Sequence, residues 1–161
     1  MFDLKFVSDI KTQDDKMKMI ADAVKKISNM EVLVGIPAEE SGRDGSVNNA
    51  ELLYIHTHGS AVKNIPARPV IEPAIEDDRE TIGDLLKKAA KAATDGDSDG
   101  AIAELEKAGM RGQNVARDWF DNPKNDWDAN KNKTIAAKGS DKPLIDTATL
   151  RGSIVYIVRE K

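Results

Sequence analysis

Three prolines within the nine residues from Ile65 to Pro73 constrain this chain more than any other local feature. They stand at Pro66, Pro69 and Pro73. A proline ring fixes φ at about −65° and removes a backbone donor, so prolines are disfavoured in helix interiors and central strands. We therefore predict that residues 65–73 form an extended, stiff segment that presets a binding surface or follows a tight packing path.

A second segment, from Lys138 to Ile154, is rich in glycine, serine, aspartate and threonine. Such residues fix backbone shape and fill turns. Neither this segment nor the proline segment contains a recognisable catalytic device. Two such segments together are typical of a chain that presents a surface to a partner.

The composition fits a single globular domain with a heavily solvated surface. The chain has 161 residues, 40% of them hydrophobic and 32% charged, which is enough to bury a core without metals or disulfides. Cysteine is absent, which excludes disulfides, thiolate zinc sites and a cysteine nucleophile. The net charge of −4 argues against a dedicated duplex-binding protein, because such proteins neutralise phosphates. No apolar run predicts a secretory signal or a membrane span.

The first part of the chain predicts a strand, a helix and a second strand. Alternating residues 2–7 predict a short strand near the N-terminus with one buried face. Apolar residues at helical spacing over 17–27 predict a helix that starts at a Thr12 or Asp9 cap. Residues 31–36 are rich in β-branched residues and precede a proline, which predicts a central strand.

A loop and a short helix are expected next. The polar residues 38–49 predict a mobile loop. Asn48 stands three residues before Glu51, the spacing of a capping box. We predict a helix over 50–58 that ends at Gly59.

Two longer helices are predicted in the second half. One apolar stripe covers residues 75–93. The next helix begins at Ser98 or Asp99 and carries Gly109 and Gly112 on its inward face. A glycine inside a helix costs about 1 kcal/mol relative to alanine, so these two are expected to let the backbone of this helix approach a neighbouring element closely.

The last part of the chain is predicted to be an exposed excursion followed by a short helix and a strand. Residues 121–143 are mostly polar and include Pro123 and Pro143. Asp146 or Thr147 is expected to cap a helical turn around Leu150, and residues 154–158 to form the last strand.

Together these elements predict an α+β domain that spans residues 1–161. Its small antiparallel or mixed sheet would contain the strands near the N-terminus, at 31–36 and at 154–158, packed against about three main helices. Strands near both ends with helices between them favour this class over a doubly wound sheet. No internal repeat is apparent.

His56 and His58 are the only histidines. On a strand this spacing would place both imidazoles on one face, as a metal pair requires. On the predicted helix they diverge by roughly 200 degrees. A metal-dependent hydrolase that uses both is an alternative of another class, although its further ligands are unspecified. We predict no catalytic, cofactor-binding or metal-ligating residue, and no enzyme.

Two basic features have open interpretations. Lys131, Lys133, Lys138 and Lys142 form a loosely basic strip near Trp127, which fits single-stranded nucleic acid binding or simply a solvated loop.

Arg68 lies between Ala67 and Pro69, where the restricted backbone would present its guanidinium in a fixed direction. Its partner is then a carboxylate across an interface or one within the same subunit.

Several short segments of the chain recur in order in a known group of proteins. The front half contains Val34-Gly35-Ile36, Ala50 to His56, Gly59, Ile65-Pro66-Ala67-Arg68-Pro69 and Pro73-Ala74. The C-terminal part contains Lys138 to Thr147, Leu150, Ser153-Ile154 and Tyr156 to Val158. Together these segments resemble the tailed-bacteriophage virion-morphogenesis family, which includes tail-completion, minor tail and head–tail joining proteins. The resemblance covers most of the chain, with similar gaps.

The resemblance implies a structural protein of the virion neck that assembles as a ring, commonly a hexamer, and joins head to tail. The implied partners are other copies of the chain, neck or connector proteins, tail-tube proteins, and DNA that passes the lumen without sequence-specific binding. No membrane is implied. The implied location is the head–tail junction, with host cytoplasm as the site of assembly. A tail terminator, which caps the tube and sets its length, is a near alternative.

A ring closes through heterologous contacts, so one face of each subunit must complement a different face of the next. The candidate interface residues fall in the two unusual segments. They are Ile65, Pro66, Ala67, Arg68, Pro69, Lys138, Lys142, Leu144, Asp146, Thr147 and Arg151.

Overall fold

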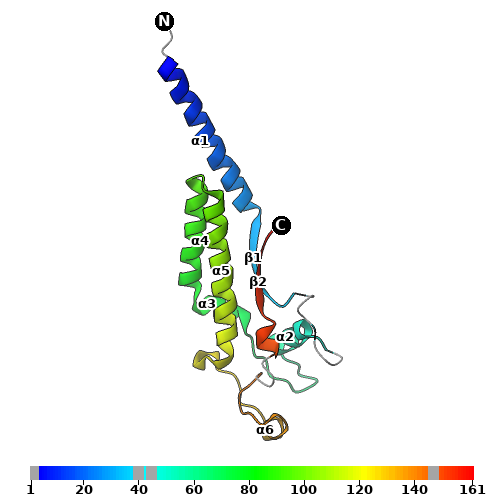
Figure 1. Cartoon of the computed structure of the whole chain (residues 1–161). Coiled ribbons are helices and arrows are strands. Elements are labelled where there is room, and N and C mark those ends of the chain that lie inside the picture. Colours follow the sequence, from blue (N-terminus) through cyan, green and yellow to red (C-terminus); the bar gives the residue numbers. More distant parts are fainter. Residues whose placement is uncertain (1–3, 38–41, 43–46, 145–148) are drawn as a thin grey trace. The chain divides into compact units, whose positions relative to one another are not determined.

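The computed structural model describes residues 4–37, 42, 47–144 and 149–161, with side chains from residue 12 onward (Figure 1). These residues form two compact units. Unit 1 contains the residues up to Val32 together with 80–108 and 158–161, and unit 2 contains 33–79 and 109–157. The helices are α1 (Leu4–Ser28), α2 (Asn49–His58), α3 (Ile71–Asp77), α4 (Arg79–Thr94), α5 (Ser98–Asp118), α6 (Asn132–Lys138) and α7 (Thr149–Gly152). Two 3-10 turns, η2 (Trp119–Asp121) and η3 (Pro123–Asn125), follow α5.

The sheet has two antiparallel strands, β1 (Met30–Gly35) and β2 (Val155–Glu160). Beyond the end of β2, the Lys161 N–H donates to the Asn29 carbonyl at 2.8 Å. The α+β class is therefore confirmed, as are the strands predicted at 31–36 and 154–158, with small shifts of their bounds.

The strand predicted near the N-terminus is wrong, because residues 4–7 belong to α1. Leu4, Val7 and Ile10 are spaced three residues apart. Apolar residues in this region therefore also fit the helical pattern that continues downstream. The predicted caps at Thr12 and Asp9 are wrong for the same reason, since both lie inside α1.

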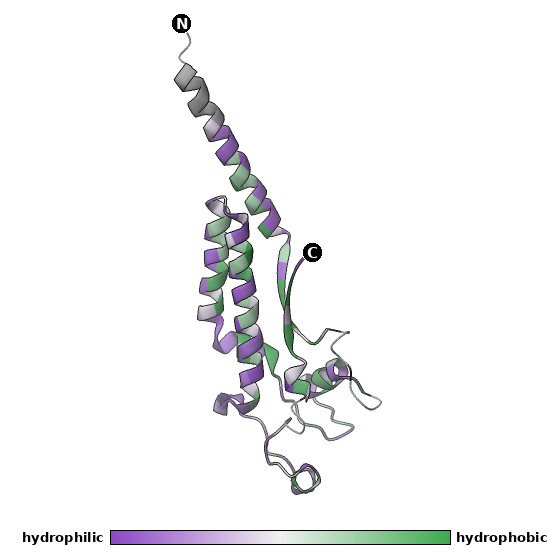
Figure 2. Ribbon diagram, viewed as in Figure 1, coloured by the Kyte–Doolittle hydropathy of each residue, from purple (hydrophilic) through white to green (hydrophobic). Residues whose placement is uncertain are grey.

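Unit 1 contains α1, most of α4 and the first half of α5. The small side chains of Ala23, Ala93 and Ala101 form its buried cluster, which lets helices approach closely. Figure 2 shows hydrophilic and hydrophobic residues interleaved along the described part of α1. The cap of α5 is Asp97 rather than Ser98 or Asp99, because the Gly100 N–H donates to Asp97 Oδ1 at 2.8 Å.

The single helix predicted over 75–93 is divided in the structure, and α3 ends before Asp78. The Asp78 carboxylate accepts hydrogen bonds from both Nε and Nη2 of Arg111, at 2.7 and 2.6 Å. Residues 71–73 are helical rather than extended, which corrects the predicted proline segment. Pro73 is tolerated because it occupies the first turn of α3, where the N–H has no intrahelical acceptor.

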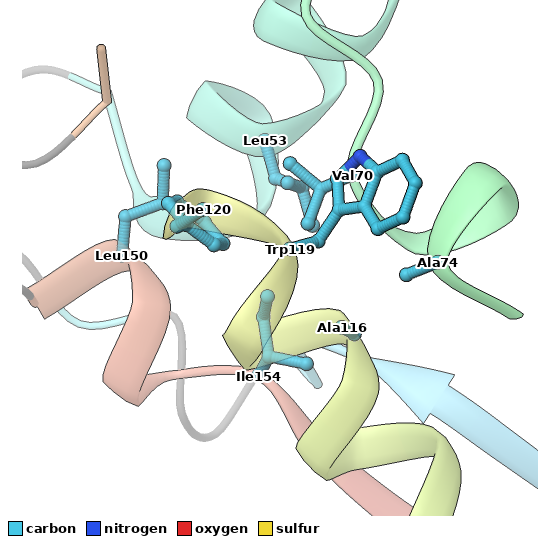
Figure 3. Close-up of a cluster of buried hydrophobic side chains, with 8 residues drawn as sticks. All are labelled: Leu53, Val70, Ala74, Ala116, Trp119, Phe120, Leu150 and Ile154. Atoms are coloured by element: carbon cyan, nitrogen blue, oxygen red, sulfur yellow. The ribbon is translucent and has the colours of Figure 1, made fainter. Parts of the chain in front are cut away.

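The core of unit 2 gathers residues from distant parts of the chain (Figure 3). The buried cluster consists of Leu53, Val70, Ala74, Ala116, Trp119, Phe120, Leu150 and Ile154. Two glycines of α5 allow this helix to pack closely against its neighbours. A Cβ at Gly109 would lie 2.4 Å from the Tyr156 ring, and one at Gly112 would lie 2.9 Å from Val34. The predicted close approach of this helix backbone to neighbouring elements is confirmed, since Tyr156 belongs to β2 and Val34 to β1.

Residues 121–143, predicted as an exposed excursion, contain η3 and α6. Trp127 within them packs edge-on against Phe120, with ring centroids 5.9 Å apart. Of the predicted loop 38–49, residues 38–41 and 43–46 lie outside the described residues.

Candidate functional site

The proline segment begins in a tight hairpin turn that follows α2. Ser60 and Ile65 exchange two backbone hydrogen bonds, of 2.8 and 2.9 Å. Gly59 has a φ of 70°, and a Cβ there would lie 2.8 Å from the Ala67 nitrogen. Only glycine fits this position, because any side chain would combine a strained φ with a backbone clash. The Arg68 N–H then donates to the His56 carbonyl at 2.6 Å, so the segment returns alongside α2.

The Arg68 side chain is buried within its own chain. It is only 7% exposed, and its Nη2 donates to the Asp128 carbonyl at 2.7 Å. Burial lowers the pKa of Arg68, and the nearby Asp128 charge acts in the opposite direction. The Arg68 Nε is buried with no hydrogen-bond partner among the described residues. Of the two interpretations open for Arg68, the geometry matches the intramolecular one, with a carbonyl as the acceptor.

The end of the proline segment is held against residues 121–143 and the core. The Trp127 indole N–H donates to the Pro69 carbonyl at 3.2 Å. The next residue, Val70, is completely buried. Trp127 is therefore partly buried by internal contacts.

The predicted residues of the C-terminal segment meet at Asp121. Lys142 Nζ lies 2.5 Å from Asp121 Oδ1, and Arg151 Nη1 lies 3.0 Å from Asp121 Oδ2. Lys138 Nζ donates to the Lys142 carbonyl at 2.6 Å. The hydrogen bond from Lys142 lowers the pKa of Asp121, and the charges of Lys142 and Arg151 add to that effect.

Leu144 has a φ of 57° and packs against the core cluster of unit 2. Asp146 and Thr147, which complete the predicted set, lie outside the described residues. The structure thus brings Lys142 and Arg151 together through one carboxylate that the sequence interpretation did not select, and Lys138 is linked to them through the Lys142 carbonyl.

A buried amide joins α2 to the C-terminal segment. Asn49 is completely buried, and its Nδ2 donates to Ser153 Oγ at 2.9 Å and to the Gly42 carbonyl at 3.0 Å. Ser153 Oγ in turn donates to the Thr149 carbonyl at 2.9 Å. Nothing along the chain indicated this contact apart from the position of Asn49 next to a helix cap.

Both histidines lie on α2, as predicted. The His58 Nδ1 lies 2.9 Å from the Tyr54 carbonyl, and the two rings are tilted with centroids 4.2 Å apart. His56 lines a separate polar cavity of about 740 Å³ that also contains Arg68 and Asp128. Within the described ranges no group of three or more histidine and carboxylate side chains is arranged to hold a metal ion.

An apolar groove of about 970 Å³ was not predicted from the sequence. It lies between residues of α2 and of the segment that leads into α3. Its lining includes Ile36, Leu53, Tyr54, Ile71, Glu72 and Glu76. Tyr54 is 66% exposed. The only indication of this groove in the sequence was the distribution of apolar residues on α2. A helix with apolar residues on more than one face needs a packing partner on more than one face.

Comparison of the chain with protein-family models, with curated proteins and with solved structures gives no match in any of the three. None of the helices that the structure describes combines the length and the apolar character needed to cross a membrane.

Proposed function

We propose that this chain is a non-enzymatic structural protein of a tailed-bacteriophage virion, which forms a ring in the neck and joins head to tail. Each copy is an α+β subunit whose small sheet packs against about three main helices. Its partners are further copies in a hexameric ring, neck or connector proteins, and tail-tube proteins. DNA passes the lumen without sequence-specific binding, which the net charge of −4 favours.

The observation that carries this proposal is the convergence of the two resembling segments in unit 2. Val70, directly after Ile65 to Pro69, shares a buried cluster with Leu150 and Ile154 of the C-terminal part. The bond from Asn49 to Ser153 adds a second link between the two parts. Segments that resemble one family and lie far apart in sequence therefore share one core, which supports a single inherited fold over scattered chance likenesses.

The apolar groove supports assembly as the mode of action. It exposes an aromatic side chain, Tyr54, and exposed aromatic residues are typical anchors of protein interfaces. The basic strip gives less support to nucleic acid binding. Lys142 is paired with Asp121, and Lys131 Nζ lies 3.4 Å from the Asn64 carbonyl.

The experiment is negative-stain electron microscopy of particles made after deletion of this gene. Separate DNA-filled heads and finished tails of normal length are the expected result. Overlong tails would assign the chain to the tail terminator instead. Intact particles would contradict both structural functions, and stoichiometric metal in purified protein, lost in His56→Ala or His58→Ala, would then favour the hydrolase.

A further inference from the structure

The hairpin turn after α2 presents an apolar and a basic side chain at its tip. Val62 is 99% exposed, and Lys63 follows it. The turn is closed by the Ser60–Ile65 bridge and by the Asn64 N–H, which donates to the Ala61 carbonyl at 3.1 Å. The tip is therefore held in one conformation before any partner binds, which lowers the entropic cost of binding. We call residues Ala61–Asn64 the hairpin tip.

The apolar groove, in the same unit, offers complementary chemistry. Leu53, Tyr54 and Ile71 supply apolar lining, and Glu72 and Glu76 supply negative charge. Glu76 is paired with Arg79 at 2.9 Å. Within the described part of the chain, neither Glu72 nor Lys63 has an ion-pair partner. An apolar tip that carries a lysine thus matches an apolar groove that carries a carboxylate.

We propose that the hairpin tip of one copy inserts into the apolar groove of a second copy, with Lys63 paired to Glu72. The exposure of Val62 means that the tip does not fill the groove of its own chain. Such a contact joins two different surfaces, so it is heterologous, and repetition generates a closed ring or an open filament. The inference rests on the proposed ring function and names the surfaces that would form it.

Cysteine cross-linking tests the contact directly, because the chain contains no cysteine of its own. Purified Val62→Cys protein is mixed with a differently tagged Ala50→Cys protein and oxidised over a range of concentrations. Ala50 lines the groove. A disulfide forms only when the two Cα atoms come within about 7 Å. The matched control is Ala90→Cys, which replaces an exposed alanine on α4.

The expected result is a mixed dimer of Val62→Cys with Ala50→Cys in roughly tenfold excess over the control pair, as an association favoured by about 1.4 kcal/mol would give. Equal yields with Ala50→Cys and Ala90→Cys, or no mixed dimer at any concentration, would overturn the proposal. Added mass on the monomer in native mass spectrometry, without a mixed dimer, would assign the groove to a small apolar ligand.

Charge exchange supplies a second test on the same cysteine pair. Lys63→Glu in the Val62→Cys copy should lower the mixed-dimer yield roughly tenfold, because like charges then face each other. Glu72→Lys in the Ala50→Cys copy should restore it. Failure of the second change to restore the yield would contradict the Lys63–Glu72 pair.

The two proposals fail separately. If cross-links are absent but gene deletion leaves separate heads and tails, the neck function stands and the hairpin contact is wrong. If cross-links form but deletion leaves intact particles, the contact stands and the neck function is wrong.

Discussion

Arg68 and Asp128 are joined across sixty residues of sequence by a 2.7 Å hydrogen bond from the guanidinium Nη2 to the backbone carbonyl. The bond ties the proline segment to residues 121–143. The donor side chain is largely desolvated, since Arg68 is 7% exposed, whereas Asp128 lies at the surface. A residue that the sequence suggested for an interface therefore makes its polar contact within the chain.

Arg68→Ala should destabilise the folded subunit. The substitution removes the hydrogen bond from the guanidinium and the packing of a buried side chain, and a hydrogen bond that involves a charged group contributes about 1.5–3 kcal/mol. The free energy of unfolding from urea denaturation measures this loss. Arg79→Ala is the control, because Arg79 forms an exposed pair with Glu76 and should change stability by about 0.5 kcal/mol or less. Equal losses in the two variants would contradict a structural role for Arg68.

Alanine at two helical glycines should have opposite effects. In Gly109→Ala the new Cβ would lie 2.4 Å from the Tyr156 ring, so we expect a loss of about 1–3 kcal/mol from overpacking. In Gly83→Ala on α4 nothing lies within 4 Å of the new Cβ, and alanine should stabilise by about 0.5–1 kcal/mol. Thermal unfolding of both variants measures the two shifts. A stabilising Gly109→Ala would mean that α5 does not approach Tyr156 closely.

Local signals predicted the elements whose stabilising contacts are local. The helix α2 is the clearest case, because Asn48 and Glu51 form the predicted capping box, with bonds of 2.9 and 3.1 Å between them. The N-terminal strand failed because the alternating residues 2–7 also fit a helical repeat, and no local contact decided between the two. The sequence did not predict the break at Asp78, because Arg111, the partner of Asp78, lies thirty-three residues away along the chain.

The candidate site was harder to predict for the same physical reason. Lys142 and Arg151 were selected from the sequence, yet their shared partner Asp121 becomes visible only after folding. The groove is likewise a product of tertiary packing, since Ile36 follows β1, Tyr54 lies on α2 and Ile71 begins α3. Residue types along the chain do not specify which of them will share a cavity.

Removal of the Asn48 cap should destabilise α2 and the surfaces that α2 helps to form. Asn48 accepts the Glu51 N–H at 2.9 Å. Asn48→Ala should cost about 0.5–2 kcal/mol, the usual effect of losing a helix cap. Asn48→Asp keeps a side-chain oxygen and should retain most of the stability. Chemical denaturation measures both, and similar losses in the two variants would argue against capping as the role of Asn48.

The ion pairs at Asp121 should make stability depend on pH in the acidic range. Lys142, and to a lesser degree Arg151, lowers the pKa of Asp121 in the folded state. A carboxylate with a lowered folded pKa contributes stability above its unfolded pKa of about 3.9, and this contribution is lost as the pH falls through the folded value. Asp121→Asn should therefore lower stability at neutral pH and have a smaller effect in acid.

A double-mutant cycle at neutral and acidic pH isolates this pair. Asp121→Asn and Lys142→Met remove the same contact, so at neutral pH their combined loss should be smaller than the sum of the single losses. The coupling should shrink in acid, where Asp121 is protonated. It should also shrink in 1 M salt, because the Debye length is then about 3 Å and the salt screens partly exposed charges. A coupling energy that is the same at both pH values would show that Lys142 stabilises the segment through packing of its aliphatic stem and not through the Asp121 charge.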